Sequence, residues 1–496
     1  MVRAAFIVGC LAFFSATTLC AQTREDRQTS LPQQFASTPK ASEETNRFSI
    51  NLPTALQLAQ ANPLDIALAG QRLEAAVAQH ERAKSLWLPT LYGGMDYARH
   101  DGRIQDIVGN VFGTSRHSLM FGTGAGAVFS LSEAFRAPLA ARQLVRAREA
   151  DVQATVNDAF LAVAEAYFGV QQARGEVAGA ADAVARATDL LQRAEKLTPA
   201  LAPALEASRA RTELSRRKQA LETAYERWHI ASAELARLLR LQPGVLVDPV
   251  EPPHLDIQLL DIRQPVDELI PVALTNRPEL ASRQAFVEAT LQRLKQERQR
   301  PLIPSVLLRG NATNPGGTLS GGAFGGGVNG DMKNFGSRHS FDLQIVWEFQ
   351  NLLAGNKAAV KERRAENQQA VLELFRTQDR IAAEVVQALA QAKAAAVRMK
   401  EAREGVQFAK ETTEQSLEGL RQTRRAGDLV VLVVRPSEAV SAVQGLAQAF
   451  ADYYTAIADH NRAQFRLYRA LGQPAQELQV TVEPKTPSPF MPPPER

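Results

Sequence analysis

The chain has 496 residues, with 57 Lys and Arg against 53 Asp and Glu and a net charge of +4. A charge this small gives no electrostatic footprint for nucleic acid, and 45% hydrophobic with 22% charged residues excludes a mainly disordered chain. Cys10 and Cys20 are the only cysteines, which excludes a disulfide scaffold and a cysteine-rich metal site.

Residues 1–21 have the pattern of a secretory signal, with a basic start, an apolar run to Phe14 and small or polar residues up to Ala21. Cleavage after Ala21 leaves a chain without cysteine, which suits an oxidising compartment. A competing interpretation makes Cys20 the lipidated first residue of a lipoprotein, although Leu19 stands where a lipobox carries a small residue. Both interpretations predict an exported protein.

The rest of the chain repeats one plan twice. Asn62-Pro63 and Leu88-Pro89 in the first half match Arg277-Pro278 and Ile303-Pro304 in the second, at the same spacing. Each half then passes through a Gly-rich region into a long segment rich in Ala, Glu and Arg. The predicted organisation is a polar extension at 22–47, a first repeat at 48–243, a Pro-rich connector at 244–266, a second repeat at 267–474 and a Pro-rich tail at 475–496.

Each half contains two segments with the period-2 alternation of β-strands, in which apolar side chains share one face and polar or small ones the other. The alternation is strongest at the end of the Gly-rich region of the second half and weakest just after Pro89. The four predicted strands are 91–98, 119–131, 306–313 and 339–350. The aromatic side chains expected to meet lipid are Phe121, Phe129, Phe341, Trp347 and Phe349.

Between the last two strands, Gly325, Gly327 and Gly330 spell GxGxxG. The dinucleotide fingerprint of that form follows a strand and opens a helix within a βαβ unit, and this segment has no such context. We therefore expect a flexible extracellular loop here.

Two segments predict unusually long helices, because 132–197 has no proline after Pro138 and 357–426 has none. About 65–70 residues at 1.5 Å per residue make a rod on the order of 100 Å, which is stable only when it packs against others. Heptad spacing supports this packing: apolar residues recur at alternating intervals of four and three, for example Val152, Val156, Ala159, Val163, Ala166 and Val170.

Four strands of about ten residues can cross an outer membrane but cannot close on themselves, and open edges in lipid leave backbone groups unpaired. Small barrels need about eight strands, which two chains would supply, but the interior of such a barrel is filled by side chains. Small and polar residues on the interior face favour an open bore and therefore three chains. The predicted fold is mainly α with transmembrane β: a trimeric 12-stranded β-barrel continued by a long periplasmic α-helical coiled-coil barrel.

This arrangement resembles the TolC-like outer-membrane efflux proteins over nearly all of residues 48–474. The resemblance depends on the duplicated helix-NP-helix-LP(T/S)-strand unit, on WEFQNLLAGNKAAV at 347–360 and on the segment at 424–473. It implies a homotrimeric duct in the outer membrane of a Gram-negative bacterium, with a large periplasmic portion. Its lower end would dock on a periplasmic adaptor and an inner-membrane pump, of RND type or, as an alternative, an ABC exporter.

The resemblance also implies two helix-to-helix turns at the periplasmic tip, where the adaptor binds. By position, these turns contain Thr198, Pro199, Ala200 and Leu201 in the first, and Arg424, Arg425, Gly427 and Asp428 in the second. Gly427 suits a helix end that needs positive φ, whereas the first turn has no glycine.

Some relatives carry a ring of carboxylates just beyond the second turn, but here a Val-rich run leads to Arg435, and Glu438 is the nearest acid. Our hypothesis is a hydrophobic and basic constriction that includes Val433 and Arg435. The alternative is that the valines pack the helix pair and Arg435 faces solvent.

The sequence therefore predicts a passive conduit for small-molecule efflux and no enzyme. The seven histidines have no ligand spacing and the motifs of bond chemistry are absent, so neither cofactor nor metal is expected. Outer-membrane lipid, an adaptor and a pump are the expected partners, and nucleic acid is not. Two alternatives remain open: a type I secretion duct for polypeptides, and a periplasmic coiled-coil scaffold without a pore.

Overall fold

The computed structural model describes residues 47–61, 63–198, 201–309, 321–328, 333–339, 341–426 and 429–473. The predicted signal peptide with Cys20, nearly all of the polar extension and the C-terminal tail lie outside the described residues. Among the helices of the described part, none contains an apolar stretch sufficient to traverse a bilayer.

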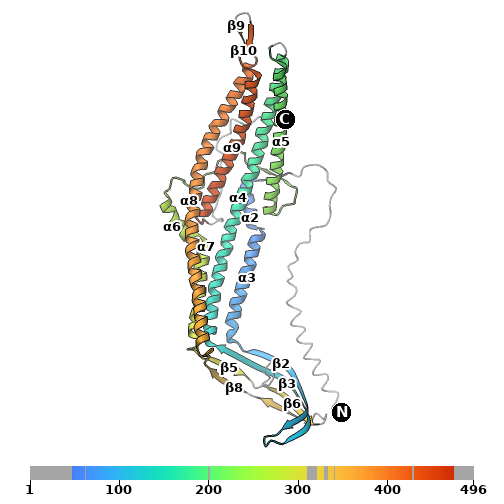
Figure 1. Cartoon of the computed structure of the whole chain (residues 1–496), viewed down its shortest axis with the longest axis vertical. Coiled ribbons are helices and arrows are strands. Elements are labelled where there is room, and N and C mark those ends of the chain that lie inside the picture. The colour runs from blue at the N-terminus through green and yellow to red at the C-terminus, as the bar shows by residue number, and fades with distance from the viewer. Residues whose placement is uncertain are drawn as a thin grey trace. The chain divides into compact units, whose positions relative to one another are not determined.

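Two long helices run through the part of the chain that begins at Arg47 (Figure 1). They are α4 (Leu131–Leu197) and α8 (Ala354–Gly419). The first matches its predicted bounds to one residue, and the second ends seven residues before the predicted position 426. Shorter helices accompany them: α3 (Leu64–Lys84) and α7 (Pro278–Gln299) near the strands, α5 (Ala204–Leu239) and α9 (Pro436–Ala470) at the other end, and α2 (Leu52–Ala61) and α6 (Val266–Asn276) midway.

The helices form a wall whose lateral order changes along its length. Near the strands, α4 lies between α3 and α7, and α7 packs on α8. Toward the other end, which we call the tip, α4 lies between α5 and α9, and α9 packs on α8. Helices α3 and α5 therefore form one lateral edge of the wall, and α8 forms the other.

The heptad positions form the seams between these helices, as predicted. Val163, Val170, Val385 and Val443 are buried, as are many of the small residues between them. At Gly175 an added Cβ would overlap the ring of Tyr454, so α4 and α9 approach each other closely at this point. Small residues in the seams thus set the spacing of the helices.

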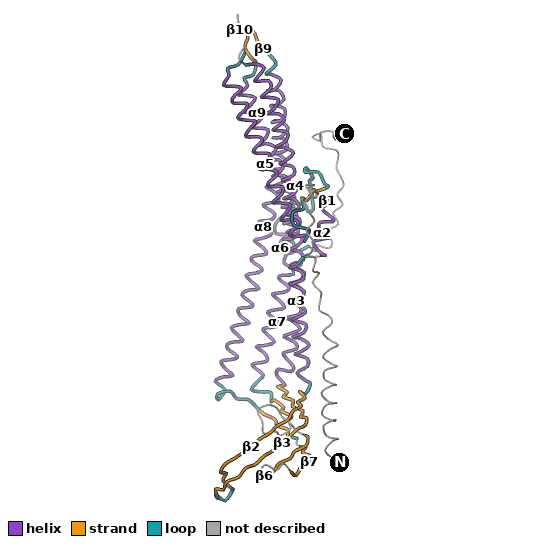
Figure 2. Tube along the Cα trace, turned by 90° about the vertical axis from the view of Figure 1, so that its right-hand side faces the viewer, coloured by secondary structure: helices purple, strands orange, loops and turns teal. Residues whose placement is uncertain are grey.

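The strands at the opposite end form one sheet with four strand positions (Figure 2). Strand β3 (Val111–Ser130) pairs along one edge with β2 (Thr90–Gln105), and along its other edge with both β5 (Ser305–Arg309) and β6 (Gly321–Val328). Strands β8 (Asp342–Val346) and β7 (Lys333–His339) pair with β5 and β6 in turn. The four predicted strands are present, with the third and fourth each in two segments.

Several strand details of the sequence prediction were wrong. The strand expected to be weakest, 91–98, lies within the 16 residues of β2, and Gly325 and Gly327 lie in β6 rather than in a loop. The ring of Phe335 in β7 covers Gly325 where a Cβ would stand, a contact that supports glycine in a strand. The last predicted strand, 339–350, contains the final residue of β7 and the whole of β8, which ends at Val346, so Trp347 and Phe349 follow the strand. Residues 310–313 and Gly330 lie outside the described residues.

The connector between the repeats contributes a strand that the sequence analysis missed. β4 (Leu246–Pro249) pairs in parallel with β1 (Arg47–Ile50), which begins at the last residue of the predicted extension. The indole N–H of Trp228 in α5 donates to the carbonyl of Val247 at 2.9 Å. This small sheet covers the middle of the wall beside α2.

Candidate functional site

The sheet has an apolar face and a polar face. Cross-strand pairs place Met95 opposite Phe121, and Tyr97 opposite Leu119, on the same face. The opposite face of the sheet carries Asp96 and, further along the strands, His100 opposite Arg116. In β8, Leu343 and Ile345 share the apolar face and are 54% and 56% exposed, so they have no cover within one chain. This alternation is what a sheet with lipid on one side and water on the other requires.

The apolar face becomes polar toward the β2–β3 turn. The Tyr97 hydroxyl and His117 Nδ1 are 2.9 Å apart, and Arg99 forms an ion pair with Asp101, which also accepts a hydrogen bond from the Ser115 hydroxyl. The apolar band is therefore limited at this end by groups suited to a membrane surface.

An aromatic cluster marks the other limit of the band, where the sheet meets the helices. Trp87 lies 5.1 Å from Phe135, edge to face, and 6.2 Å from Phe129, measured between ring centroids. Trp347 and Phe349, which follow β8 at the same junction, are 51% and 57% exposed, whereas Phe341, at the other end of β8, is 79% exposed. Trp and Tyr gather at membrane surfaces because one end of the ring is apolar and the other polar, and girdles of aromatic residues flank the apolar band of outer-membrane barrels. The sequence analysis missed Trp87 and Phe135, because neither lies in a strand.

The first tip turn lies where it was expected. Helix α4 ends at Leu197 and α5 begins at Ala204. The backbone N–H groups of Leu201 and Ala202 both donate to the Leu197 carbonyl, at 2.8 and 3.0 Å, which closes the turn without glycine. The Thr198 hydroxyl donates to the Ala194 carbonyl at 2.9 Å, and Leu201 is 41% exposed. Pro199 and Ala200 lie outside the described residues.

The second tip turn is not a helix-to-helix turn, and this prediction was wrong. Helix α8 ends at Gly419, and the chain then forms a β-hairpin of β9 (Thr423–Ala426) and β10 (Leu429–Leu432), which we call the tip hairpin (Figure 2). The run Val430–Val434 favours extended backbone, and Pro436 prevents α9 from starting earlier. Gly427 and Asp428 lie outside the described residues.

The chain just after the tip hairpin contacts the end of α8. Val434 packs against Gly419, where an added Cβ would overlap it. Val431 and Val433 are 43% and 52% exposed, so they do not fill a helix seam. Cross-strand pairing places Arg424 opposite Val431, on the same face. The exposed face of the hairpin therefore combines valine with arginine.

The two remaining predicted constriction residues lie at the start of α9. Arg435 is exposed and extended, and Pro436 is the first helical residue. The Glu438 carboxylate accepts a hydrogen bond from the Arg435 backbone N–H at 3.3 Å. Glu438 thus caps its own helix, a role that explains the acid at this position without a gate.

Midway along the wall lies a group of charges around the buried Arg277 that we call the central cluster. Its members are Asp158, Arg277, Glu279, Glu384 and Arg469, from α4, the α6–α7 junction, α8 and α9. The Arg277 side chain is 1% exposed and donates to Glu279 at 2.9 Å and to Glu384 at 2.7 Å. Arg469 contacts Asp158 at 2.6 Å, Glu279 at 2.9 Å and Glu384 at 3.0 Å.

The electrostatics of the central cluster are balanced by these pairs. Burial alone would raise the pKa of Glu279, but Arg277 and Arg469 together hold that pKa below its ordinary value. Glu279 is therefore ionised, and the cluster joins helices from both repeats. The cluster has a structural role, since its charged groups form ion pairs with one another and hold these helices together.

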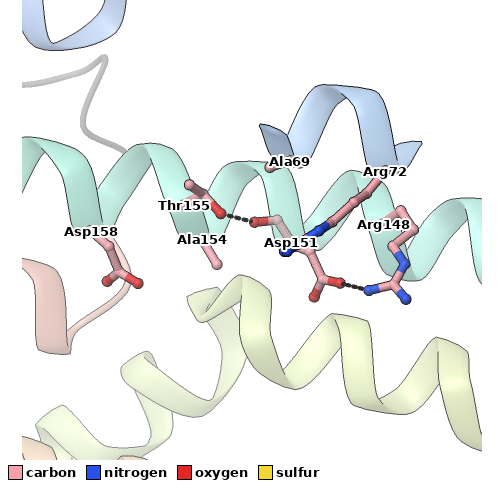
Figure 3. A pocket seen from close by; sticks show the side chains of 7 residues that line it. All are labelled: Ala69, Arg72, Arg148, Asp151, Ala154, Thr155 and Asp158. Atoms are coloured by element: carbon pink, nitrogen blue, oxygen red, sulfur yellow. Dashed lines mark hydrogen bonds and ion pairs between the residues drawn. The ribbon is translucent and has the colours of Figure 1, made fainter. Parts of the chain in front are cut away.

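A polar hollow of about 240 Å³ lies between α3 and α4 (Figure 3). Arg72 reaches over it from α3, while Arg148 and Asp158 line it from α4. Asp151 accepts hydrogen bonds from Arg148 at 2.9 Å and from the Ser282 hydroxyl at 2.6 Å. Small-molecule sites are usually larger and mainly apolar, so this hollow is a poor ligand site. Within the described residues, no group of three or more His, Cys, Asp or Glu is arranged to hold a metal ion.

Comparison with known proteins gives one family. The model of the family described as "Outer membrane efflux protein" matches residues 55–239 and 269–430, one stretch in each half of the chain. A search of curated proteins found no match.

Solved structures share the fold. A membrane protein from Pseudomonas aeruginosa superposes with a TM-score of 0.70 at 18% identity, over 85% of this chain and 93% of its own. The outer membrane protein VceC from Vibrio cholerae gives 0.66 at 16% identity, over 85% and 96%. The open state of the MtrE outer membrane channel from Neisseria gonorrhoeae gives 0.66 at 17% identity, over 85% and 89%.

Proposed function

Because the chain belongs to the outer membrane efflux protein family, we propose that three copies form the outer-membrane duct of a tripartite export system for small molecules. Membership places the protein in the outer membrane, with a large periplasmic part, in a family of channels rather than enzymes. The observation that supports a shared duct is that the sheet and the helical wall have open lateral edges on the same two sides.

The sheet edges come first. Among the described residues, nothing pairs with the outer edge of β2 on one side or of β7 and β8 on the other. In lipid, unpaired backbone groups cost several kcal/mol each, so these edges need partners. β2 runs away from the helices and β8 runs toward them, so β2 of one copy can continue antiparallel to β8 of the next. Three copies of four strand positions then close a twelve-stranded ring.

The helical edges follow the same order, because β2 continues from α3 and β8 leads into α8. The α8 edge carries apolar side chains in solvent, including Leu372 at 67%, Val397 at 62% and Phe408 at 62% exposure. The opposite edge has a groove of about 340 Å³ between α4 and α5, with Ile230 on its wall at 62% exposure. Each edge thus offers apolar surface that a second copy would cover.

The groove and Val397 lie at the same level of the wall. Gln172, in the groove, donates to Thr455 of α9 at 3.2 Å. Tyr453 of α9 packs beside Met399 of α8, two residues from Val397. Rotation about an axis along the helices keeps every residue at its own level, so Val397 of one copy meets the Ile230 groove of the next.

Cysteine cross-linking tests this arrangement in the full chain. Ile230→Cys combined with Val397→Cys should give, on oxidation, a ladder in denaturing gels that ends at three copies. Ile230→Cys combined with Leu372→Cys is the matched control, since Leu372 is on the same helix but about 38 Å from Val397. A ladder that continues past three copies, or equal cross-linking in the control, would contradict the closed trimer.

The tip is the end of the duct that we propose meets the adaptor. The residues proposed from the sequence are Thr198, Pro199, Ala200 and Leu201 at the first turn and Arg424, Arg425, Gly427 and Asp428 at the second. Leu201, Arg424 and Arg425 are exposed in a single chain, which suits a docking surface. A pump in the inner membrane, of RND type or an ABC exporter, would supply the energy for export, because a passive channel supplies none.

Beside the hairpin, we propose that Val433 and Arg435 from three copies narrow the pore. Cationic side chains at a constriction favour anions, so Arg435→Ser should shift the selectivity of single channels toward cations by about twofold. Arg435 makes no ion pair with a described residue, which keeps its charge available. Unchanged conductance and selectivity would show that Arg435 faces solvent outside the pore.

A further inference from the structure

Among the described residues, no further strand pairs with either edge of the tip hairpin. It is a sheet of two strands, with Thr423 opposite Leu432 and Arg425 opposite Val430. The Val433 N–H donates to the Gln422 carbonyl at 3.0 Å, which identifies Gln422–Val433 as a hydrogen-bonded pair. Such pairs alternate along an antiparallel ladder, so the backbone groups of Thr423 and Arg425 point away from β10. β9 therefore presents donors and acceptors to a further strand.

The same edge is strongly basic. Arg424 and Arg425 are exposed, and neither forms an ion pair with a described residue. Of the carboxylates near the hairpin in the described part of the chain, Glu418 pairs with Arg421 at 3.5 Å and Glu438 caps α9. Successive side chains of a strand point to opposite faces, so the two guanidinium groups flank the edge above and below. A segment that pairs with β9 would meet positive charge on both faces.

We propose that the β9 edge of the tip hairpin binds an extended, acidic segment of a partner protein by β-strand addition. The proposal deepens the proposed function, because it depends on the tip being the docking end of the duct. Main-chain hydrogen bonds from Thr423 and Arg425 supply the pairing, and Arg424 and Arg425 select carboxylates.

The β9 edge of a second copy does not fit this edge. Pairing of the β9 edges of two copies would bring Arg424 and Arg425 of one copy toward those of the other. Juxtaposed like charges oppose association, whereas carboxylates on a different protein complement the edge. The charge of the hairpin thus favours a partner of opposite sign.

Peptide binding to the purified full-length protein tests the proposal. The probe is a fluorescein-labelled peptide, VEEVEEVEEV, which carries glutamates on both faces of an extended strand. Fluorescence anisotropy should detect its binding, and the double variant Arg424→Glu with Arg425→Glu should weaken it about tenfold or more. The charge-reversed peptide VKKVKKVKKV should then bind the variant better than the wild type. Equal binding of both peptides to the wild type would overturn the proposal.

Two controls separate strand addition from charge attraction and from self-association. The acidic peptide N-methylated at every second residue keeps its charge but loses hydrogen-bond donors, so it should bind about tenfold more weakly. Equal affinity would contradict strand addition. Thr423→Cys should remain uncross-linked on oxidation, whereas disulfide-linked copies would assign the edge to a second copy.

The proposed function is measured independently in the same preparations. Single-channel recording of wild type and double variant shows whether the protein forms a duct at all. Conductance with no selective peptide binding would contradict the docking mode alone, and peptide binding without conductance would contradict the duct alone.

Discussion

Arg277 and Arg469 lie midway along the helical wall, whereas Arg424 and Arg425 lie in the tip hairpin. The first two are largely buried and each contacts at least two carboxylates, so their charges are used within one chain. The second two are exposed and form no ion pair with a described residue. The same side chain thus ties helices together in one region and remains available to a partner in the other. Substitutions in the first region should change stability, and those in the second should change binding.

The largest effect is expected at Arg277. Arg277→Met leaves the largely buried Glu279 and the partly exposed Glu384 with one cation fewer, and loss of one partner from a buried pair typically costs about 3–5 kcal/mol. Chemical denaturation of purified protein measures this free energy of unfolding. Arg293→Met, an exposed position on α7, is the control and should change it by less than about 0.5 kcal/mol. Equal losses of unfolding free energy for Arg277→Met and Arg293→Met would show that the central cluster contributes no more to stability than an exposed arginine.

A smaller loss is expected at Gly472, which packs against the backbone of Arg277. Its φ is +71°, and an added Cβ would lie 2.8 Å from the Arg277 nitrogen. Gly472→Ala should therefore destabilise the protein by about 2 kcal/mol, mostly from the left-handed backbone. Gly405→Ala in α8, where nothing lies within 4 Å of an added Cβ, should instead stabilise it by about 0.5–1 kcal/mol. A neutral result at Gly472 would mean that the contact with Arg277 can shift freely.

The central cluster should also make stability sensitive to acid through Glu279. Its pKa is lowered in the folded state from a reference value of 4.5, so ionisation stabilises the fold above that pH. This contribution is lost as the pH falls through the lowered pKa. Glu279→Gln should cost about 1–2 kcal/mol at pH 7 and flatten the fall of Tm below pH 4.5. Glu268→Gln, at an exposed position of α6, should leave the pH profile of Tm unchanged.

The smallest effect on stability belongs to the tip hairpin. Arg424→Glu with Arg425→Glu replaces exposed side chains that form no ion pair with a described residue, so the free energy of unfolding should change by less than about 0.5 kcal/mol. A loss comparable to that of Arg277→Met would show that these arginines hold the tip together, and the comparison between the two regions would fail.

The sequence predicted the elements whose pattern is long and regular. Residues 132–197 matched α4 to one residue, because alanine-rich heptads without proline leave few alternatives to a long helix. The alternation at 339–350 correctly placed Leu343 and Ile345 on an apolar face, although the strand proved shorter. Both patterns are local, so the chain segment itself carries the information.

The misses have physical reasons. At the second tip turn, the prediction followed the family resemblance, which implies a helical turn. The β-branched run Val430–Val434 and the proline at 436 favour a hairpin instead. The central cluster joins Asp158 to residues more than a hundred positions away, so no local pattern reveals it. Trp87 and Phe135 lie outside the strands, and only the fold brings their rings together with Phe129.

The account depends most on the shared wall, since one chain leaves both edges of its sheet unpaired. Single-channel recording of the purified full-length protein in a planar bilayer tests that claim most directly. Trimers with a continuous bore should give discrete openings of one uniform size. Folded, membrane-inserted protein that is monomeric and gives no openings would contradict the account.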